Sequence, residues 1–209
     1  MTAVEDRPLR ADAARNVERI LRATRDVYGE LGPDAPVEAV ARRAKVGERT
    51  LYRRFPTKGD LVRAALDQTI AEDLTPAIEQ ARRNDDPLLG VTHLIETAIS
   101  LGAREHNLLI AAQRAGTLTS DISVSLDEAL EELAREGQRA GRIRADLVAD
   151  DLPRLIVMLY SVLSTMDADS AGWRRYVALI VDAISTNERQ PLPPAAALHY
   201  ASEPNSWPL

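Results

Sequence analysis

Basic and hydroxyl-bearing side chains are concentrated in residues 46–61, VGERTLYRRFPTKGDL, which hold three arginines, one lysine, two threonines and a tyrosine. Arginine forks bind phosphate oxygens and guanine edges, lysine binds phosphate as a point charge, and hydroxyl groups donate to phosphate oxygens. Phe55, the only phenylalanine of the chain, lies in the same segment. The residue types indicate a polyanion-binding surface, and the alternative is an ordinary solvated face of a helix.

The net charge of −6 is divided unevenly along the chain. Residues 1–65 contain 14 of the 26 basic residues and 10 of the 32 acidic ones, a balance of +4. The remaining residues contain 12 basic and 22 acidic residues, a balance of −10. A basic N-terminal third on an acidic body suggests a polyanion-binding head joined to a body with another task, although an excess of this size also arises by chance.

Three helices are predicted in the basic third. Residues 12–31 place apolar side chains three and four residues apart, and Gly32-Pro33 ends that helix. Pro36 suits the first turn of a second helix of about two turns, and Val46-Gly47 separates it from a third helix over residues 48–55. Two short helices joined by a tight turn and braced by a longer one form a helix-turn-helix, whose second helix enters the DNA major groove.

Further helices are predicted over residues 58–83, 87–103, 105–115, 121–140, 150–167 and 171–186, with a kink at Pro76 and the charged turn Arg104-Glu105-His106 facing water. No segment shows the alternation of a strand, so the fold class is all-α. The predicted organisation is a flexible arm over residues 1–11, a DNA-binding domain over 12–57, a helical effector-binding and dimerisation domain over 58–186, and a Pro-rich tail over 187–209.

The segment VEAVARRAKVGERTLYRRFPTKGDLVRAAL, residues 37–66, resembles the DNA-binding domain of the TetR family of transcriptional regulators. The residues that carry the resemblance are Val37, Val40, Ala41, Ala44, Val46, Thr50, Leu51, Tyr52, Phe55, Pro56, Lys58 and Leu61. Three positions depart from the family pattern: Lys45 replaces a usual glycine, Gly47 a usual serine or threonine cap, and Arg49 a residue that is often glycine. Because Arg49 is expected to change which bases are read, no family operator is transferred to this chain.

The resemblance implies a DNA-binding surface made of Glu48, Arg49, Thr50, Tyr52, Arg53, Arg54 and Lys58. Thr50, Tyr52 and Lys58 are expected to contact phosphates, whereas Glu48, Arg49 and Arg53 are the candidates for base contacts. Arg54 would lie over the DNA backbone or pair with Glu48. Arg7 and Arg10 are weaker candidates for contacts in the minor groove.

The resemblance also implies a homodimer that binds a palindromic operator and a pocket for a small-molecule effector. Two C-terminal helices are apolar around more than one face, which predicts a dimer interface at Leu155, Leu159, Leu163, Tyr176, Ile180 and Ile184; the alternative is burial within one chain. The residues expected to line the pocket are His93, Thr97, Gln113, Met158 and Trp173. The alternative, which is the commoner role for any one such residue, is an ordinary core or surface position.

Other functions find little support in the sequence. The three histidines, His93, His106 and His199, lie far apart, and there is no cysteine, so neither a metal site, a cofactor nor a catalytic residue is predicted. The absence of a signal peptide and of a long apolar segment predicts a cytoplasmic protein without membrane contact. A helical adaptor that binds protein partners and has only non-specific DNA affinity is the remaining alternative. The sequence hardly distinguishes a repressor from an activator, but the resemblance implies a repressor that a small-molecule effector releases from its operator, because repression is the commoner mode in that family.

Overall fold

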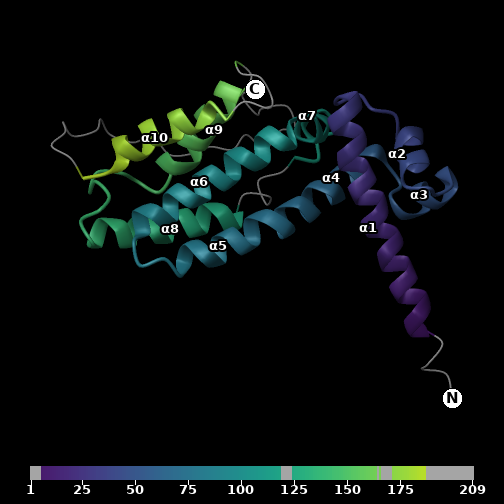
Figure 1. Ribbon diagram of the computed structural model, residues 1–209, viewed down its shortest axis with the longest axis horizontal. Helices are drawn as coiled ribbons and strands as arrows, with labels where there is room; N and C mark the ends of the chain where they lie inside the picture. The colour runs from purple at the N-terminus through teal and green to yellow at the C-terminus, as the bar shows by residue number, and fades with distance from the viewer. Residues whose placement is uncertain (1–5, 119–123, 164, 166–170, 187–209) are drawn as a thin grey trace. The chain divides into compact units, whose positions relative to one another are not determined.

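The computed structural model describes residues 6–118, 124–163, 165 and 171–186, with side chains described from Ala14 onward (Figure 1). Its elements are all helical: α1 (Asp6–Leu31), α2 (Val37–Arg43), α3 (Glu48–Arg54), α4 (Lys58–Thr69), η1 (Ile70–Leu74), α5 (Thr75–Arg82), α6 (Pro87–Arg104), α7 (His106–Arg114), α8 (Val124–Arg139), α9 (Asp151–Leu163) and α10 (Trp173–Ile184). The prediction of an all-α fold is confirmed. None of these described helices combines the length and apolar character needed to cross a bilayer.

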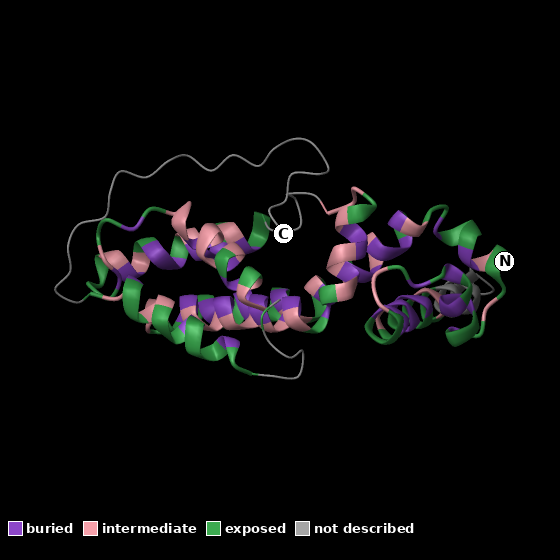
Figure 2. Ribbon diagram, turned by 90° about the horizontal axis from the view of Figure 1, so that it is seen from above, coloured by how far each residue is buried: buried purple, intermediate pink, exposed green. Residues whose placement is uncertain are grey.

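The chain divides into two compact units, each with its own apolar core (Figure 2). The first unit, Met1–Gln68 with Glu105–Leu118, contains α1 to α3, most of α4, and α7. The second unit, Thr69–Arg104 with Thr119–Leu209, contains η1, α5, α6, α8, α9 and α10. The unit that holds the helix-turn-helix therefore also contains α7, although α7 lies far from the helix-turn-helix in the sequence.

Helix α1 begins at Asp6, six residues before the start predicted at Asp12. The six residues added include two arginines, one leucine and one alanine, which favour helix, and Pro8 lies in the first turn, where its missing N–H costs nothing. They lack an apolar stripe, so periodicity did not reveal them. The predicted arm is thus helical from Asp6 onward, and both residues 1–5 and the predicted tail at 187–209 lie outside the described residues.

The turn between α6 and α7 differs from the prediction that all of it faces water, because Glu105 is buried. Glu105 is only 5% exposed, and its Oε1 accepts a hydrogen bond from Nε of Arg25 at 3.0 Å. The two side chains form an ion pair between α1 and the start of α7. A buried carboxylate is stable only when paired, so Arg25 holds this turn of α7 against α1.

The predicted long helix over residues 58–83 is interrupted by one π-helical turn, η1, directly before α5. In this turn the N–H of Thr75 donates to the carbonyl of Ile70, five residues back. Pro76 follows, and it could neither donate to residue 72 in α-helical register nor avoid a clash of its ring with that carbonyl. The irregularity predicted at Pro76 is therefore a change of helical register.

In the second unit, α6 packs against α5, α8, α9 and α10 and supplies the centre of the core. The closest approach is at Gly102 of α6, where a Cβ atom would lie 2.0 Å from Cε1 of Tyr160 on α9. The hydroxyl of Tyr160 donates to the carbonyl of Ala98 at 2.9 Å. Burial raises the pKa of Tyr160, so this phenol remains a hydrogen-bond donor. Glycine at 102 is what lets α9 lie this close to α6.

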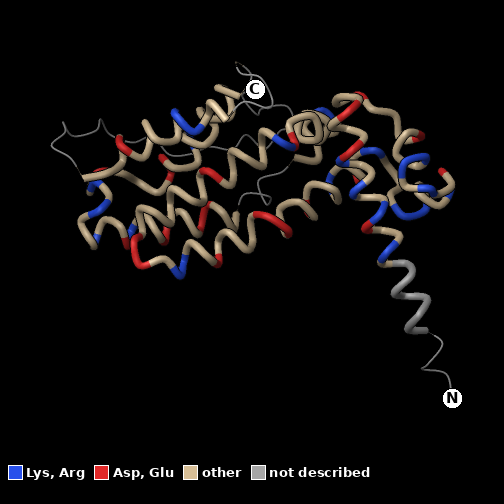
Figure 3. The backbone as a smooth tube through the Cα atoms, in the orientation of Figure 1, with Lys and Arg blue, Asp and Glu red and all other residues tan. Residues whose placement is uncertain are grey.

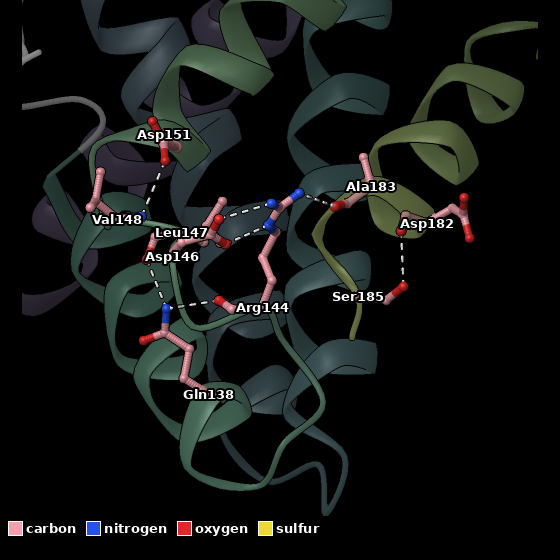
Figure 4. A network of polar contacts seen from close by, with 9 residues as sticks. All are labelled: Gln138, Arg144, Asp146, Leu147, Val148, Asp151, Asp182, Ala183 and Ser185. Atoms are coloured by element: carbon pink, nitrogen blue, oxygen red, sulfur yellow. Dashed lines mark hydrogen bonds and ion pairs between the residues drawn. The ribbon is translucent and has the colours of Figure 1, made fainter. Parts of the chain in front are cut away.

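A polar network joins the α8–α9 connection to the end of α10 (Figure 4). Arg144 forms a two-pronged ion pair with Asp146 and donates from Nη1 to the carbonyl of Ala183 at 3.4 Å. Nε2 of Gln138 donates to the carbonyls of Arg144 and Leu147 at 3.1 and 2.7 Å. A cation at the C-terminal end of a helix is favourable with the helix dipole, so Arg144 both caps α10 and fixes this connection.

Candidate nucleic-acid interface

Helix α2 ends in a Schellman motif that directs the chain into α3. The N–H of Val46 donates to the carbonyl of Ala41 at 3.0 Å, and the N–H of Lys45 donates to that of Arg42 at 3.2 Å. This motif requires a left-handed residue after the C-cap, a position normally occupied by glycine. Lys45 occupies it with φ of 53°. The departure from the family pattern at Lys45 is therefore accommodated by a strained lysine and not by a different turn.

Helix α3 begins after Gly47, which makes no side-chain cap and offers only its carbonyl, accepting from Thr50 N at 2.9 Å. Leu51 and Phe55 are 1% and 7% exposed, and they anchor the helix in the first core. With those two residues inward, the remaining side chains face outward or lie at the boundary. Thr50 is half-buried, Tyr52 is 41% exposed, and Glu48, Arg49, Arg53 and Arg54 are exposed.

The basic residues of this unit, which are blue along the backbone in Figure 3, fall into two groups according to their partners. Several are engaged within the unit: Arg43 with Glu30 at 3.0 Å, Arg114 with Asp34 at 2.8 Å and Arg63 with Asp67 at 2.8 Å. Among the described residues, the charged groups of five others from α2 to α3 have neither a hydrogen-bond nor an ion-pair partner: Arg42, Lys45, Arg49, Arg53 and Arg54. The alternative for Arg54, an intramolecular pair with Glu48, does not form. Cations on and just before α3 are thus left without an intramolecular partner.

The N-terminus of α4 lies beside this surface in sequence and carries a reciprocal cap. Oγ1 of Thr57 accepts from the N–H of Asp60 at 3.0 Å, and Oδ2 of Asp60 accepts from the N–H of Thr57 at 3.0 Å. This confirms Thr57 as the cap. Lys58 follows, with its ammonium 5.4 Å from the centroid of the Tyr28 ring.

The residues expected to bind an effector are not all brought together. His93 and Thr97 lie one turn apart on α6, both half-buried, and the hydroxyl of Thr97 donates back to the carbonyl of His93 at 2.8 Å. Trp173 is 5% exposed in the second core, whereas Met158 is 61% exposed and lies on the surface of the chain. Gln113 belongs to the first unit. The effector pocket remains a prediction.

The residues expected at a dimer interface also separate into groups. Leu159 and Ile184 are each 2% exposed and pack in the core of their own unit, because α9 and α10 turn these faces toward α6. Leu155, Leu163 and Ile180 are partly buried against that core, and Tyr176 is 39% exposed. Sequence reasoning missed Leu179, which is 55% exposed on α10. Because α10 carries apolar residues around most of its circumference, their spacing did not indicate that Leu179 would be exposed.

A two-turn helix, a tight turn and a second helix with unpaired arginines define a helix-turn-helix DNA-binding protein. Residues 20–65 match the family model described as bacterial regulatory proteins, tetR family. No curated protein matches the chain.

Among solved structures, a TetR regulator from Mycobacterium vanbaalenii is 29% identical over 86% of this chain and 100% of its own, with a TM-score of 0.60. One from Streptomyces coelicolor is 27% identical over 81% of this chain and 98% of its own, with a TM-score of 0.59. Residues 20–65 therefore match the DNA-binding domain of the tetR family, and over most of its length the chain is similar to TetR-family transcriptional regulators.

This assignment confirms the prediction of a DNA-binding transcriptional regulator as opposed to an enzyme. The same fold is found in the regulator FadR of Bacillus subtilis, solved in complex with stearoyl-CoA. FadR is 21% identical over 80% of this chain and 98% of its own, with a TM-score of 0.64. At that identity the likeness concerns the fold alone.

Proposed function

We propose that this regulator is a repressor that binds a palindromic operator as a homodimer and is released by a small-molecule effector. DNA binding is supported by a difference among the basic side chains of the first unit: some form ion pairs with carboxylates, and those on α3 do not. Carboxylates neutralise Arg43, Arg63 and Arg114, while no such partner among the described residues neutralises Arg49 or Arg53 on α3. An unpaired guanidinium group is free to bind a phosphate or a guanine edge without first breaking an ion pair.

Support for base reading by α3 comes from the outward positions of Glu48, Arg49 and Arg53. Tyr52 and Thr50 offer hydroxyl groups for phosphates, and Lys58 adds a cation at the first turn of α4, where the helix dipole already favours an anion. Arg42, at the end of α2, extends the proposed surface by one cation that the sequence argument did not include. Phosphate contacts would position the protein, and Arg49 with Arg53 would carry most of the specificity.

Support for a homodimer comes from the surface of α9 and α10. Met158, Tyr176 and Leu179 are exposed, with Leu155 and Ile180 partly buried beside them in the same helices. Exposed apolar side chains gathered on two neighbouring helices are typical of a protein interface, whereas scattered ones are not. The proposed interface therefore uses Met158 and Leu179 together with Leu155, Leu163, Tyr176 and Ile180, and it leaves Leu159 and Ile184 in the core of each chain.

Support for an effector is more general. A TetR-fold regulator solved with stearoyl-CoA demonstrates that this fold can hold a small molecule. In the present chain His93 and Thr97 would offer polar groups on α6, the helix at the centre of the second core. The acidic balance of the body favours a cationic or neutral effector over an anionic one.

The proposal is tested by binding to the DNA upstream of the protein's own gene, measured over a series of salt concentrations with competitor DNA. Arg49→Ala should weaken specific binding by about 1–3 kcal/mol and relax discrimination at the bases it reads. Tyr52→Phe should weaken binding less, because it removes one phosphate contact. Weak binding that follows salt alone and is the same in both variants would instead favour the adaptor that binds protein partners.

Dimerisation is tested separately by sedimentation. Leu179→Lys or Met158→Lys should shift the protein toward monomer and weaken operator binding. Leu89→Lys is a matched control, because Leu89 is also 55% exposed but lies on α6. A dimer that survives both α9 and α10 variants would refute this interface.

A further inference from the structure

Lys58 has an unusual partner for a lysine at a helix N-terminus. Its ammonium lies over the ring of Tyr28 at 5.4 Å from the centroid, inside the distance of about 6 Å at which a ring attracts a cation. Tyr28 belongs to the last full turn of α1 and is 0% exposed. No carboxylate among the described residues forms an ion pair with Lys58. Asp60, two residues on, is occupied by the backbone N–H and hydroxyl of Thr57.

The choice of a ring as partner has an electrostatic consequence. A carboxylate would hold the ammonium but cancel its charge, and a phosphate would then have to displace that carboxylate. A neutral ring attracts the cation through its quadrupole and leaves the net charge of +1 in place. Burial and the nearby Asp34 raise the pKa of Tyr28 to about 12, so the ring carries no charge at neutral pH.

The side chain of Tyr28 is buried in the first core, and its backbone is fixed by two hydrogen bonds. The backbone carbonyl of Tyr28 accepts hydrogen bonds from the N–H of Gly32 at 3.0 Å and from Nδ2 of Asn107 at 3.1 Å. Its hydroxyl, in contrast, is buried without a hydrogen-bond partner. A buried hydroxyl without a partner costs stability, so it is the aromatic face and not the hydroxyl that this position uses.

We propose that Tyr28 is a positioning residue for DNA binding, whose buried ring holds the ammonium of Lys58 at the start of α4 in the place where it meets a backbone phosphate. The role rests on the proposed function of Lys58 as a phosphate contact. A lysine side chain loses rotamer freedom when it is fixed, and this loss opposes binding. Because the ring already restricts the Lys58 side chain in the free protein, less conformational entropy is lost when DNA binds, which is preorganisation.

The test uses the full chain and a duplex enriched by the wild type from a random-sequence library. Affinity is measured over a salt series for wild type, Tyr28→Phe, Tyr28→Leu, Lys58→Met and the double variant Tyr28→Leu/Lys58→Met. Val27→Ala, made alone and together with Lys58→Met, is the matched control for a loosened core, since Val27 is 2% exposed on the same helix. Arg49→Ala reports on the proposed interface itself.

Tyr28→Phe should bind like wild type, because phenylalanine keeps the ring face. Tyr28→Leu should weaken binding by about two- to fivefold per bound subunit. Lys58→Met should lower the slope of log K against log salt by about 1 per subunit, and Tyr28→Leu should add nothing in that background. Val27→Ala, in contrast, should act equally with and without Lys58.

Equal losses from Tyr28→Leu with and without Lys58 would overturn the positioning role while leaving DNA binding by Lys58 intact. No enriched duplex, or wild-type binding by both Arg49→Ala and Lys58→Met, would overturn the proposed function and this inference with it. Should Tyr28→Leu fail to fold, NMR of the wild type decides the matter. The ε-methylene protons of Lys58 should be shifted upfield by the ring current in wild type and in Tyr28→Phe, and unshifted protons would overturn the role.

Discussion

Replacing Lys45 with glycine should stabilise the protein, although the substitution removes a whole side chain. Lys45 follows the C-cap of α2 with φ of 53°, in the left-handed region. There the Cβ of any L-residue other than glycine crowds the following carbonyl. The two hydrogen bonds of the Schellman motif, from Lys45 N and Val46 N, hold the backbone in this conformation despite the strain.

The magnitude follows from two opposing contributions. Relief of left-handed strain is worth about 1–2 kcal/mol per residue. Glycine makes the unfolded chain more flexible, which costs about 0.4–1 kcal/mol. The net gain expected for Lys45→Gly is therefore about 0.5–1 kcal/mol, which raises Tm by about 1–4 °C in a chain of this length.

The assay is urea unfolding followed by circular dichroism, with Lys45→Ala and Lys45→Asn as companions. Alanine removes the charge but keeps the Cβ, so it should give no gain. Asparagine tolerates the left-handed region better than lysine does and should fall between alanine and glycine. All three variants should bind DNA somewhat more weakly and with a smaller salt slope if Lys45 contacts a phosphate.

Equal stabilities for Lys45→Ala and Lys45→Gly would refute the reasoning, because the effect would then come from charge and not from backbone strain. A less stable Lys45→Gly would mean that the lysine stem makes packing contacts that outweigh the strain.

Three further substitutions test the cores of the two units. Gly102→Ala should lower the free energy of unfolding by about 1–3 kcal/mol, because its Cβ would lie 2.0 Å from Tyr160 Cε1, and the loss in urea unfolding should shrink in a Tyr160→Ala background. Tyr28 has its pKa raised to about 12 from an ordinary value of about 10, so the unfolded chain ionises first. Stability should therefore fall as pH rises from about 10 to 12, and Tyr28→Phe should lose less over that range. Arg25→Met should cost about 2–4 kcal/mol by removing this ion pair from the buried carboxylate of Glu105, and Glu105→Gln in the same protein should recover part of it.

The helices and the DNA-binding surface were predictable because both depend on local sequence. Spacing of apolar residues and the turn at Val46-Gly47 located α2 and α3 to within a residue, since short helices with one buried face have little freedom of register. The outward positions of Arg49 and Arg53 follow directly from the inward positions of Leu51 and Phe55.

What could not be predicted depends on partners distant in sequence. Nothing local to Glu105 reveals that Arg25, 80 residues away, makes its burial possible. In the same way, α9 and α10 are apolar around so much of their circumference that only the packing against α6 reveals Leu159 as inward and Met158 as outward. The left-handed conformation of Lys45 could not be predicted, because lysine rarely adopts it and glycine normally occupies this position.

The π-turn of η1 adds one residue to the helix, so every later side chain is shifted by about 100° around the helix axis relative to an unbroken α-helix. Buried positions recur at Leu61, Ala65 and Thr69, a stripe that an unbroken α-helix would continue at about residues 72–73, 76 and 80. The buried positions observed are instead Leu74, Ala77 and Ala81, each about one residue later. Removing one residue from this turn would shift the phase of the helix by about 100°, so the apolar side chains of α5 would no longer lie toward α6 and α8 in the second unit. The length of this short segment is thus constrained as strictly as the identity of a core residue.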